Sequence, residues 1–101
     1  MIVVLFRTRL RADAGPDYQP LADRMLALAQ AMPGFVSFKH YGAPDGERIS
    51  VVEFASTADA NRWRDHPEHY AAQQRGRNDF YAWYRLQVCD QVRESVFEPA
   101  R

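Results

Sequence analysis

Residues 2–11 read Ile-Val-Val-Leu-Phe-Arg-Thr-Arg-Leu-Arg. β-Branched and aromatic residues followed by arginines that alternate with Thr8 and Leu10 are typical of a β-strand. Side chains alternate between the two faces of a strand. One face carries Val3 and Leu5, and the other carries Ile2, Val4, Phe6 and Leu10. Both faces are apolar, so something must cover each side of the sheet to which this strand belongs.

The segment after this strand has the pattern of an amphipathic helix. Its apolar residues recur at spacings of four, three and four positions, at Leu21, Met25, Leu28 and Met32. Pro16 and Asp17 open the segment. It ends at residues 32–34, Met-Pro-Gly, because proline cannot continue a helix and glycine tolerates the turn.

Two further strands are predicted over residues 35–43 and 48–55. Residues 44–47 between them, Pro-Asp-Gly-Glu, have the residue types of a tight reversal, so the two strands form a hairpin.

A second helix begins at residues 56–59, Ser-Thr-Ala-Asp, which resemble a capping box with Asp in place of the usual Glu or Gln. Pro67 interrupts this helix because proline disfavours helical geometry at the preceding His66. We expect a kink or a restart that runs toward Gly76. Residues 80–92 then alternate in polarity, which predicts a long last strand.

The predicted order is β-α-β-β-α-β, the order of the ferredoxin-like α+β fold. Its simplest compact form is a four-stranded antiparallel sheet with both helices on one face, and right-handed crossovers make the first strand central. A chain of 101 residues has room for one such domain, spanning residues 1–101. Because both helices lie on one face, the other apolar face stays uncovered in a monomer, and we therefore expect an obligate dimer. Replacing Phe6 by a charged residue should split this dimer or unfold the protein.

Composition argues against several classes of partner. Thirteen basic and thirteen acidic residues balance, so no net positive field attracts nucleic acid or anionic lipid. The longest apolar stretch, residues 2–6, is too short to span a membrane and lacks the features of a signal peptide. We expect a cytoplasmic protein with neither nucleic acid nor membrane as a partner. We expect the single cysteine, Cys89, to be a packed thiol.

Rings and titratable groups concentrate between residues 61 and 84. His66 and His69 are three positions apart and would share a face of an unbroken helix, which suits a metal or a proton relay. Pro67 weakens that geometry, and no third ligand stands at zinc-site spacing, so we expect no metal. The structural alternative is that His66 caps the restarted helix and His69 is partly exposed.

Over nearly its whole length the sequence resembles the antibiotic biosynthesis monooxygenase family. The matching features, in order, are residues 32–35 (Met-Pro-Gly-Phe), Phe54, Trp63, residues 66–69 (His-Pro-Glu-His) and Phe80 with Tyr81. The resemblance implies a homodimer whose two sheets form a barrel, with a substrate cleft between sheet and helices. Some relatives oxidise phenolic or quinol substrates with molecular oxygen and no cofactor, and others degrade haem.

The resemblance implies that the haem-degrading branch of the family needs an axial histidine and an asparagine near the end of the first strand. Trp63 matches the tryptophan of that branch, but the other two positions fall on Gln73 and Arg7. We therefore expect no haem and no other cofactor.

Several residues are candidates for the walls and the charge of a cleft. Trp63, Tyr70 and Tyr84 can wall an aromatic slot that holds a planar phenolic ring, although Trp63 also suits a core position. Arg7 or Arg85 either faces the cleft and stabilises an anion, or forms an Arg-Glu pair with Glu53 that supports the sheet.

The favoured function is cofactor-independent monooxygenation of a small phenolic or quinol-type aromatic molecule by molecular oxygen. In this hypothesis His69 or His66 is the base, Arg7 stabilises the anion, and Trp63 with Tyr70 stacks on the ring. Two alternatives on the same fold remain: a non-catalytic small-ligand-binding or stress-response module, and a haem-binding or haem-degrading relative.

Overall fold

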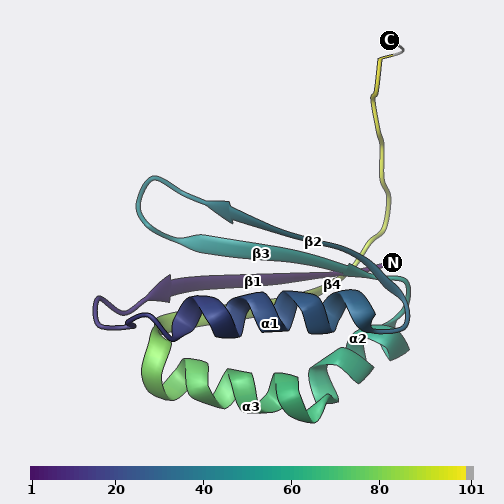
Figure 1. Ribbon diagram of the computed structural model, residues 1–101. Helices are drawn as coiled ribbons and strands as arrows, with labels where there is room; N and C mark the ends of the chain where they lie inside the picture. The colour runs from purple at the N-terminus through teal and green to yellow at the C-terminus, as the bar shows by residue number, and fades with distance from the viewer. Residues whose placement is uncertain (100–101) are drawn as a thin grey trace.

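Four antiparallel strands form a single sheet in the computed structural model, which describes residues 1–99 (Figure 1). The strands are β1 (Ile2–Leu10), β2 (Phe35–Gly42), β3 (Arg48–Phe54) and β4 (Tyr81–Asp90), in the order β2-β3-β1-β4. The first strand is central, as predicted, and the ferredoxin-like fold is confirmed. The last two residues of the domain expected over residues 1–101 lie outside the described part.

The helices all lie on one side of the sheet (Figure 1). They are α1 (Tyr18–Ala31), α2 (Thr57–Asp65) and α3 (Pro67–Arg75), followed by a π-helical turn, η1 (Gly76–Phe80). The predicted break at Pro67 is a complete restart. His66 has extended backbone angles, and its Nδ1 accepts a hydrogen bond from the backbone N–H of Glu68, which caps α3. The capping role expected of His66 is therefore confirmed.

Gly34 fixes the turn between α1 and β2. Its φ of +76° favours glycine, and a Cβ at this position would lie 2.1 Å from the side chain of Asp59. Asp59 belongs to the first turn of α2, so this glycine lets the end of one helix approach the start of another.

The core lies between the helices and the sheet. Its buried members are Ile2, Val4, Ala29, Val52, Phe54, Ala60 and Trp63. Leu5 and Val51 face each other across β1 and β3 on the opposite side, which we call the outer face, and both stay partly exposed. No helix among residues 1–99 covers that face, and none is long and apolar enough to cross a membrane.

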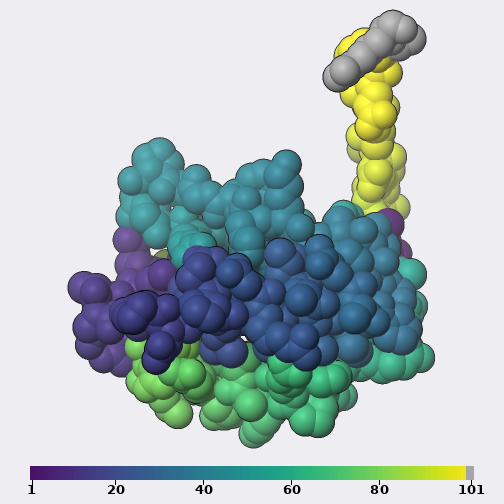
Figure 2. Space-filling view, viewed as in Figure 1, coloured from purple at the N-terminus to yellow at the C-terminus, as the bar shows by residue number. Residues whose placement is uncertain are grey.

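Residues 91–99 leave the domain as an extended segment, which we call the tail. Figure 2 shows it as a column that touches the body only at its base. At that base the backbone N–H of Gln91 donates to the carbonyl oxygen of Met1 at 2.9 Å. Phe97 is 87% exposed and Val92 is 98% exposed. Cys89, expected to be packed, is also exposed.

Candidate functional site

A cavity of about 240 Å³ lies between the helices and the sheet. Its floor consists of alternate strand residues, because every second side chain of a strand points toward the helices. The floor residues are Val4, Phe6, Thr8, Phe38, His40, Arg48, Ser50, Val52, Tyr81, Leu86 and Val88. The roof and walls come from the helices: Tyr18, Leu21, Ala22, Met25, Ala60, Asn61, Trp63, Arg64, His69, Ala72 and Gln73.

Strand pairing gives this floor a gradient of polarity. Its successive rows of paired residues are Val88-Val4-Val52, Leu86-Phe6-Ser50 and Thr8-Arg48. The first row is wholly apolar, and Trp63 lies near it, with its ring centroid 5.5 Å from that of Phe54. We call this the apolar end. The last row carries Arg48, whose guanidinium lies 5.5 Å from the ring centroid of Tyr18, and we call this the polar end.

His69 lies beneath the indole at the apolar end. Its ring centroid is 4.2 Å from that of Trp63, and the residue is only 8% exposed. Burial lowers the pKa of His69, so the imidazole is neutral at pH 7. Its Nδ1 lies 3.4 Å from the carbonyl oxygen of Arg64, which can only accept a hydrogen bond. The proton therefore belongs on Nδ1, and Nε2 keeps the lone pair of a base.

Trp63 serves the core and the cavity together. Its ring lies against Phe38, Phe54 and His69, and the residue is 8% exposed. Its indole N–H is buried and has no acceptor among residues 1–99. An unpartnered donor costs free energy, so ring packing rather than hydrogen bonding holds this side chain in place.

The polar end combines a cation with two phenols. Tyr18 and Tyr81 lie with ring centroids 6.1 Å apart beside Arg48. Burial, followed by the proximity of Tyr18, raises the pKa of Tyr81, which keeps its phenol protonated. Arg48 has no carboxylate within 4.0 Å in the described chain. The cavity thus offers a positive charge and the neutral hydroxyl of Tyr81 at one end.

A second histidine lines the cavity on β2. The Nδ1 of His40 lies 2.8 Å from the hydroxyl oxygen of Ser50. Partial burial lowers the pKa of His40, and the charge of Arg48 lowers it further. The sequence analysis did not identify five of these residues as part of the site: Tyr18, His40, Arg48, Ser50 and Tyr81. The alternation along residues 48–52 was the available signal, since it places every second residue on the face of Val4.

Comparison with known proteins agrees with this architecture. A sequence model described as antibiotic biosynthesis monooxygenase matches residues 1–75. The chain belongs to the antibiotic biosynthesis monooxygenase family. This match confirms the resemblance that the sequence motifs indicated.

Individual relatives extend the match along the chain. It is 33% identical over 96 residues to the uncharacterized protein YqjZ of Bacillus subtilis (strain 168), covering 95% of this chain and 82% of that protein. The structure of Rv0793 from Mycobacterium tuberculosis superposes with a TM-score of 0.82 at 21% identity, covering 94% of this chain and 98% of that one.

A mutant of SnoaB, a cofactor-independent oxygenase from Streptomyces nogalater, superposes with a TM-score of 0.77 at 12% identity. The superposition covers 92% of this chain and 94% of that one. At such identities both structural matches show a shared fold.

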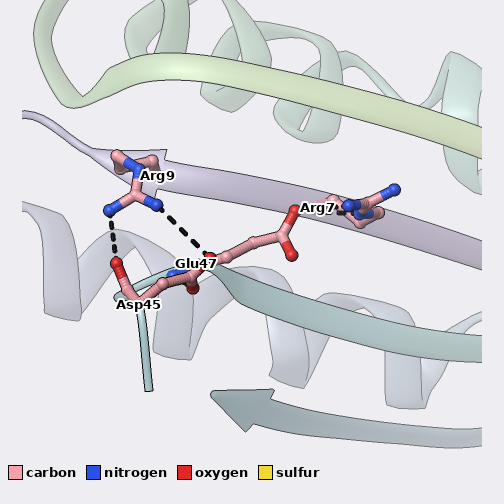
Figure 3. Close-up of polar contacts among 4 residues, drawn as sticks. All are labelled: Arg7, Arg9, Asp45 and Glu47. Carbon is pink, nitrogen blue, oxygen red and sulfur yellow. Dashed lines mark hydrogen bonds and ion pairs between the residues drawn. The ribbon is translucent and has the colours of Figure 1, made fainter. Parts of the chain in front are cut away.

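Arg7 and Arg85 lie away from the cavity of this antibiotic biosynthesis monooxygenase family member. They face each other across β1 and β4 on the outer face, because odd-numbered residues of β1 point away from Val4 and Phe6. Arg7 pairs with Glu47, not with the expected Glu53, and its Nε donates to Oε1 at 2.9 Å (Figure 3). The Arg-Glu pair thus exists with a different carboxylate.

The expected aromatic slot has different walls. Tyr70 follows His69 on α3, and because successive helical residues diverge by about 100° it is 60% exposed. The hydroxyl of Tyr84 accepts a hydrogen bond from Nε of Arg77 at 2.9 Å. Neither tyrosine lines the cavity. The rings that do are Phe6, Tyr18, Phe38, Trp63 and Tyr81.

The two predicted histidines have separate roles. His66 lies at the helix break as a cap, whereas His69 lines the cavity and is buried rather than partly exposed. No group of three His, Cys, Asp or Glu side chains able to hold a metal ion occurs among residues 1–99. Gln73, at the position that the resemblance gives to an axial histidine, lines the cavity with an amide, which does not fit haem ligation there.

Proposed function

We propose that this family member acts as one domain that oxygenates a small phenolic or quinol-type aromatic molecule with molecular oxygen and without a cofactor. One observation supports this most directly. A buried, neutral imidazole, that of His69, lies against the indole of Trp63 inside a cavity lined by aromatic rings. Such a cavity would orient a planar ring by stacking, exclude water and place a base beside it.

The chemistry requires only deprotonation, positioning and desolvation. Nε2 of His69 takes the proton of the ring hydroxyl, and the resulting phenolate is rich enough in electrons to react with oxygen. One oxygen atom becomes a carbonyl on a ring carbon and the other leaves as water, so the substrate supplies all four electrons. The protein contributes the base and the dry, shaped cavity.

An oxygen electrode tests the proposal with a panel of dihydroxy-aromatic compounds. We expect oxygen uptake above the uncatalysed rate for some compounds, and a large decrease of this uptake at pH 7 in His69→Gln. Trp63→Phe, which keeps a ring in the core, should weaken binding. Tyr70→Phe is the matched control, because Tyr70 is exposed on the same helix and should not matter.

Oxygen uptake at no more than the uncatalysed rate for every compound in the panel would contradict the proposal. That result would favour the other function open to this fold, a non-catalytic small-ligand-binding or stress-response module.

We also propose that the active form is a homodimer. The outer face carries the partly exposed pair Leu5 and Val51, and no helix of the described chain covers it. The tail holds Phe97 at 87% exposure away from its own domain. A second copy whose sheet packs against the outer face would bury both, and burying apolar surface contributes roughly 25 cal/mol per Å².

A further inference from the structure

The two arginines that line the cavity differ in their partners. Arg64 is paired with the neighbouring carboxylate of Asp65, with Nε and Oδ1 2.8 Å apart. Arg48 has no carboxylate within 4.0 Å among residues 1–99. It is nevertheless half-buried and points to the helix side of the sheet, where it faces Thr8 across the β1–β3 pair. Its charge is therefore available to a ligand in the cavity.

Arg48 is also held in place. Its guanidinium lies 5.5 Å from the ring centroid of Tyr18, a distance at which a cation is attracted to an aromatic ring. A guanidinium positioned in this way presents a planar fork of N–H donors that matches the two oxygens of a carboxylate or the single oxygen of a phenolate. Arg48 is therefore positioned to present these donors to an anion in the cavity.

Tyr81 supplies a neutral donor at the same end. Its phenol stays protonated because burial and the neighbouring Tyr18 raise its pKa. Gly76 allows the ring to lie close to η1, since a Cβ on this glycine would be 2.3 Å from the Tyr81 ring. A cation and a fixed hydroxyl donor thus meet where the cavity floor changes from apolar to polar.

We propose that the polar end of the cavity is an anion subsite in which Arg48, assisted by Tyr81, binds an ionised oxygen of the substrate. The substrate is then an aromatic molecule with a carboxylate or an acidic hydroxyl at one end, and its ring system extends toward Trp63 and carries there the hydroxyl that His69 deprotonates. This inference rests on the proposed use of the cavity as the substrate site. Arg48, rather than Arg7, is the anion-binding residue.

Binding of two aromatic probes tests this subsite without requiring turnover. Isothermal titration calorimetry compares 2-naphthoate with 2-naphthalenemethanol, which has the same ring system without the charge. A charge-assisted hydrogen bond contributes about 1.5–3 kcal/mol, so we expect roughly ten- to hundredfold tighter binding of the naphthoate. Arg48→Gln should abolish this preference by weakening naphthoate binding alone, and Arg48→Lys should restore part of it.

Arg62→Gln is the matched control, because Arg62 is an exposed arginine that does not line the cavity. It should keep the preference, and circular dichroism should show that every variant is folded. Equal affinities for the two probes in the wild type, no binding of either, or a preference that survives in folded Arg48→Gln would overturn the subsite. Selective naphthoate binding without oxygen uptake on any substrate would instead leave the subsite standing and contradict the proposed oxygenation.

Discussion

His69 derives its chemical character from its surroundings. The chain breaks at His66 and restarts at Pro67, which brings His69 beneath Trp63 in the first turn of α3. Burial opposes the charged imidazolium, and the Arg64 carbonyl holds Nδ1 in its protonated form. A histidine on the exposed side of the same helix would titrate near its ordinary pKa and would carry no fixed tautomer.

The proposed base makes the pH dependence of turnover a test of His69. The group is active when neutral, and its pKa lies below the usual 6.5, so turnover in the wild type should be at its plateau by pH 7. In His69→Ala the substrate hydroxyl must ionise by itself, so the profile should move toward higher pH. Oxygen uptake measured from pH 5 to pH 10 distinguishes the two, and an unshifted profile would remove His69 from the mechanism.

The same burial predicts a dependence of stability on pH. The unfolded chain binds a proton at His69 near pH 6.5, whereas the folded chain binds it only at lower pH. Stability from this group is therefore complete above pH 6.5 and falls as the pH drops toward the folded-state pKa. Thermal melts between pH 7.5 and pH 5 should show a smaller loss of Tm in His69→Gln than in the wild type. Equal losses would mean that folding does not lower the pKa of His69.

Sequence predicted part of the site at this scale and missed the rest for a definite reason. Trp63 and His69 were identified because aromatic and titratable residues cluster around a broken helix. Arg7 was assigned to the cleft although strand alternation places it with Leu5 on the outer face. Arg48 was overlooked because only the pairing of β1 with β3 brings it opposite Thr8, and that register is a long-range property.

At the scale of elements, the π-helical turn η1 positions the polar end of the cavity. The turn begins at Gly76 and ends at Phe80, and the backbone N–H of the next residue, Tyr81, donates to the Gly76 carbonyl. Pattern reasoning predicted the two helices on either side of Pro67 but not this turn. Apolar periodicity distinguishes helices from strands, whereas a single wide turn leaves no repeat to detect.

Gly76→Ala should show what this turn does. Gly76 has ordinary helical angles, and intrinsic propensity alone would favour alanine by about 1 kcal/mol. The new Cβ would lie 2.3 Å from the Tyr81 ring, so we expect a net destabilisation of about 1–3 kcal/mol and a displaced ring. Urea unfolding measures the loss. In a Tyr81→Ala background the same substitution should become neutral or stabilising, and an unchanged penalty there would contradict the contact.

Gly42→Ala is the matched control for this clash. A Cβ at Gly42 would meet nothing within 4 Å, so its unfolding free energy should change little.

At the scale of the whole molecule, the sheet separates two environments. Even-numbered residues of β1 meet the helices and form the core and the cavity floor, whereas Val3, Leu5 and the arginines face outward. The apolar character of both faces was evident from residues 2–11 alone. Which face belongs to the cavity depends on where the helices lie, so Phe6, expected to be sensitive to charge because of the dimer, is a cavity residue.

Assembly is therefore best tested at Leu5. Leu5 and Val51 form a cross-strand pair at the centre of the outer face, and a charge there would be buried without a partner if two sheets pack together. We expect the wild type to sediment as a dimer at micromolar concentration, and Leu5→Glu or Val51→Glu to yield monomers or to unfold. Ala71→Glu, on the exposed side of α3, is the control and should remain dimeric. A stable, folded wild-type monomer at micromolar concentration would contradict the dimer, because it would show that the outer face and the exposed Phe97 tolerate water without a second copy.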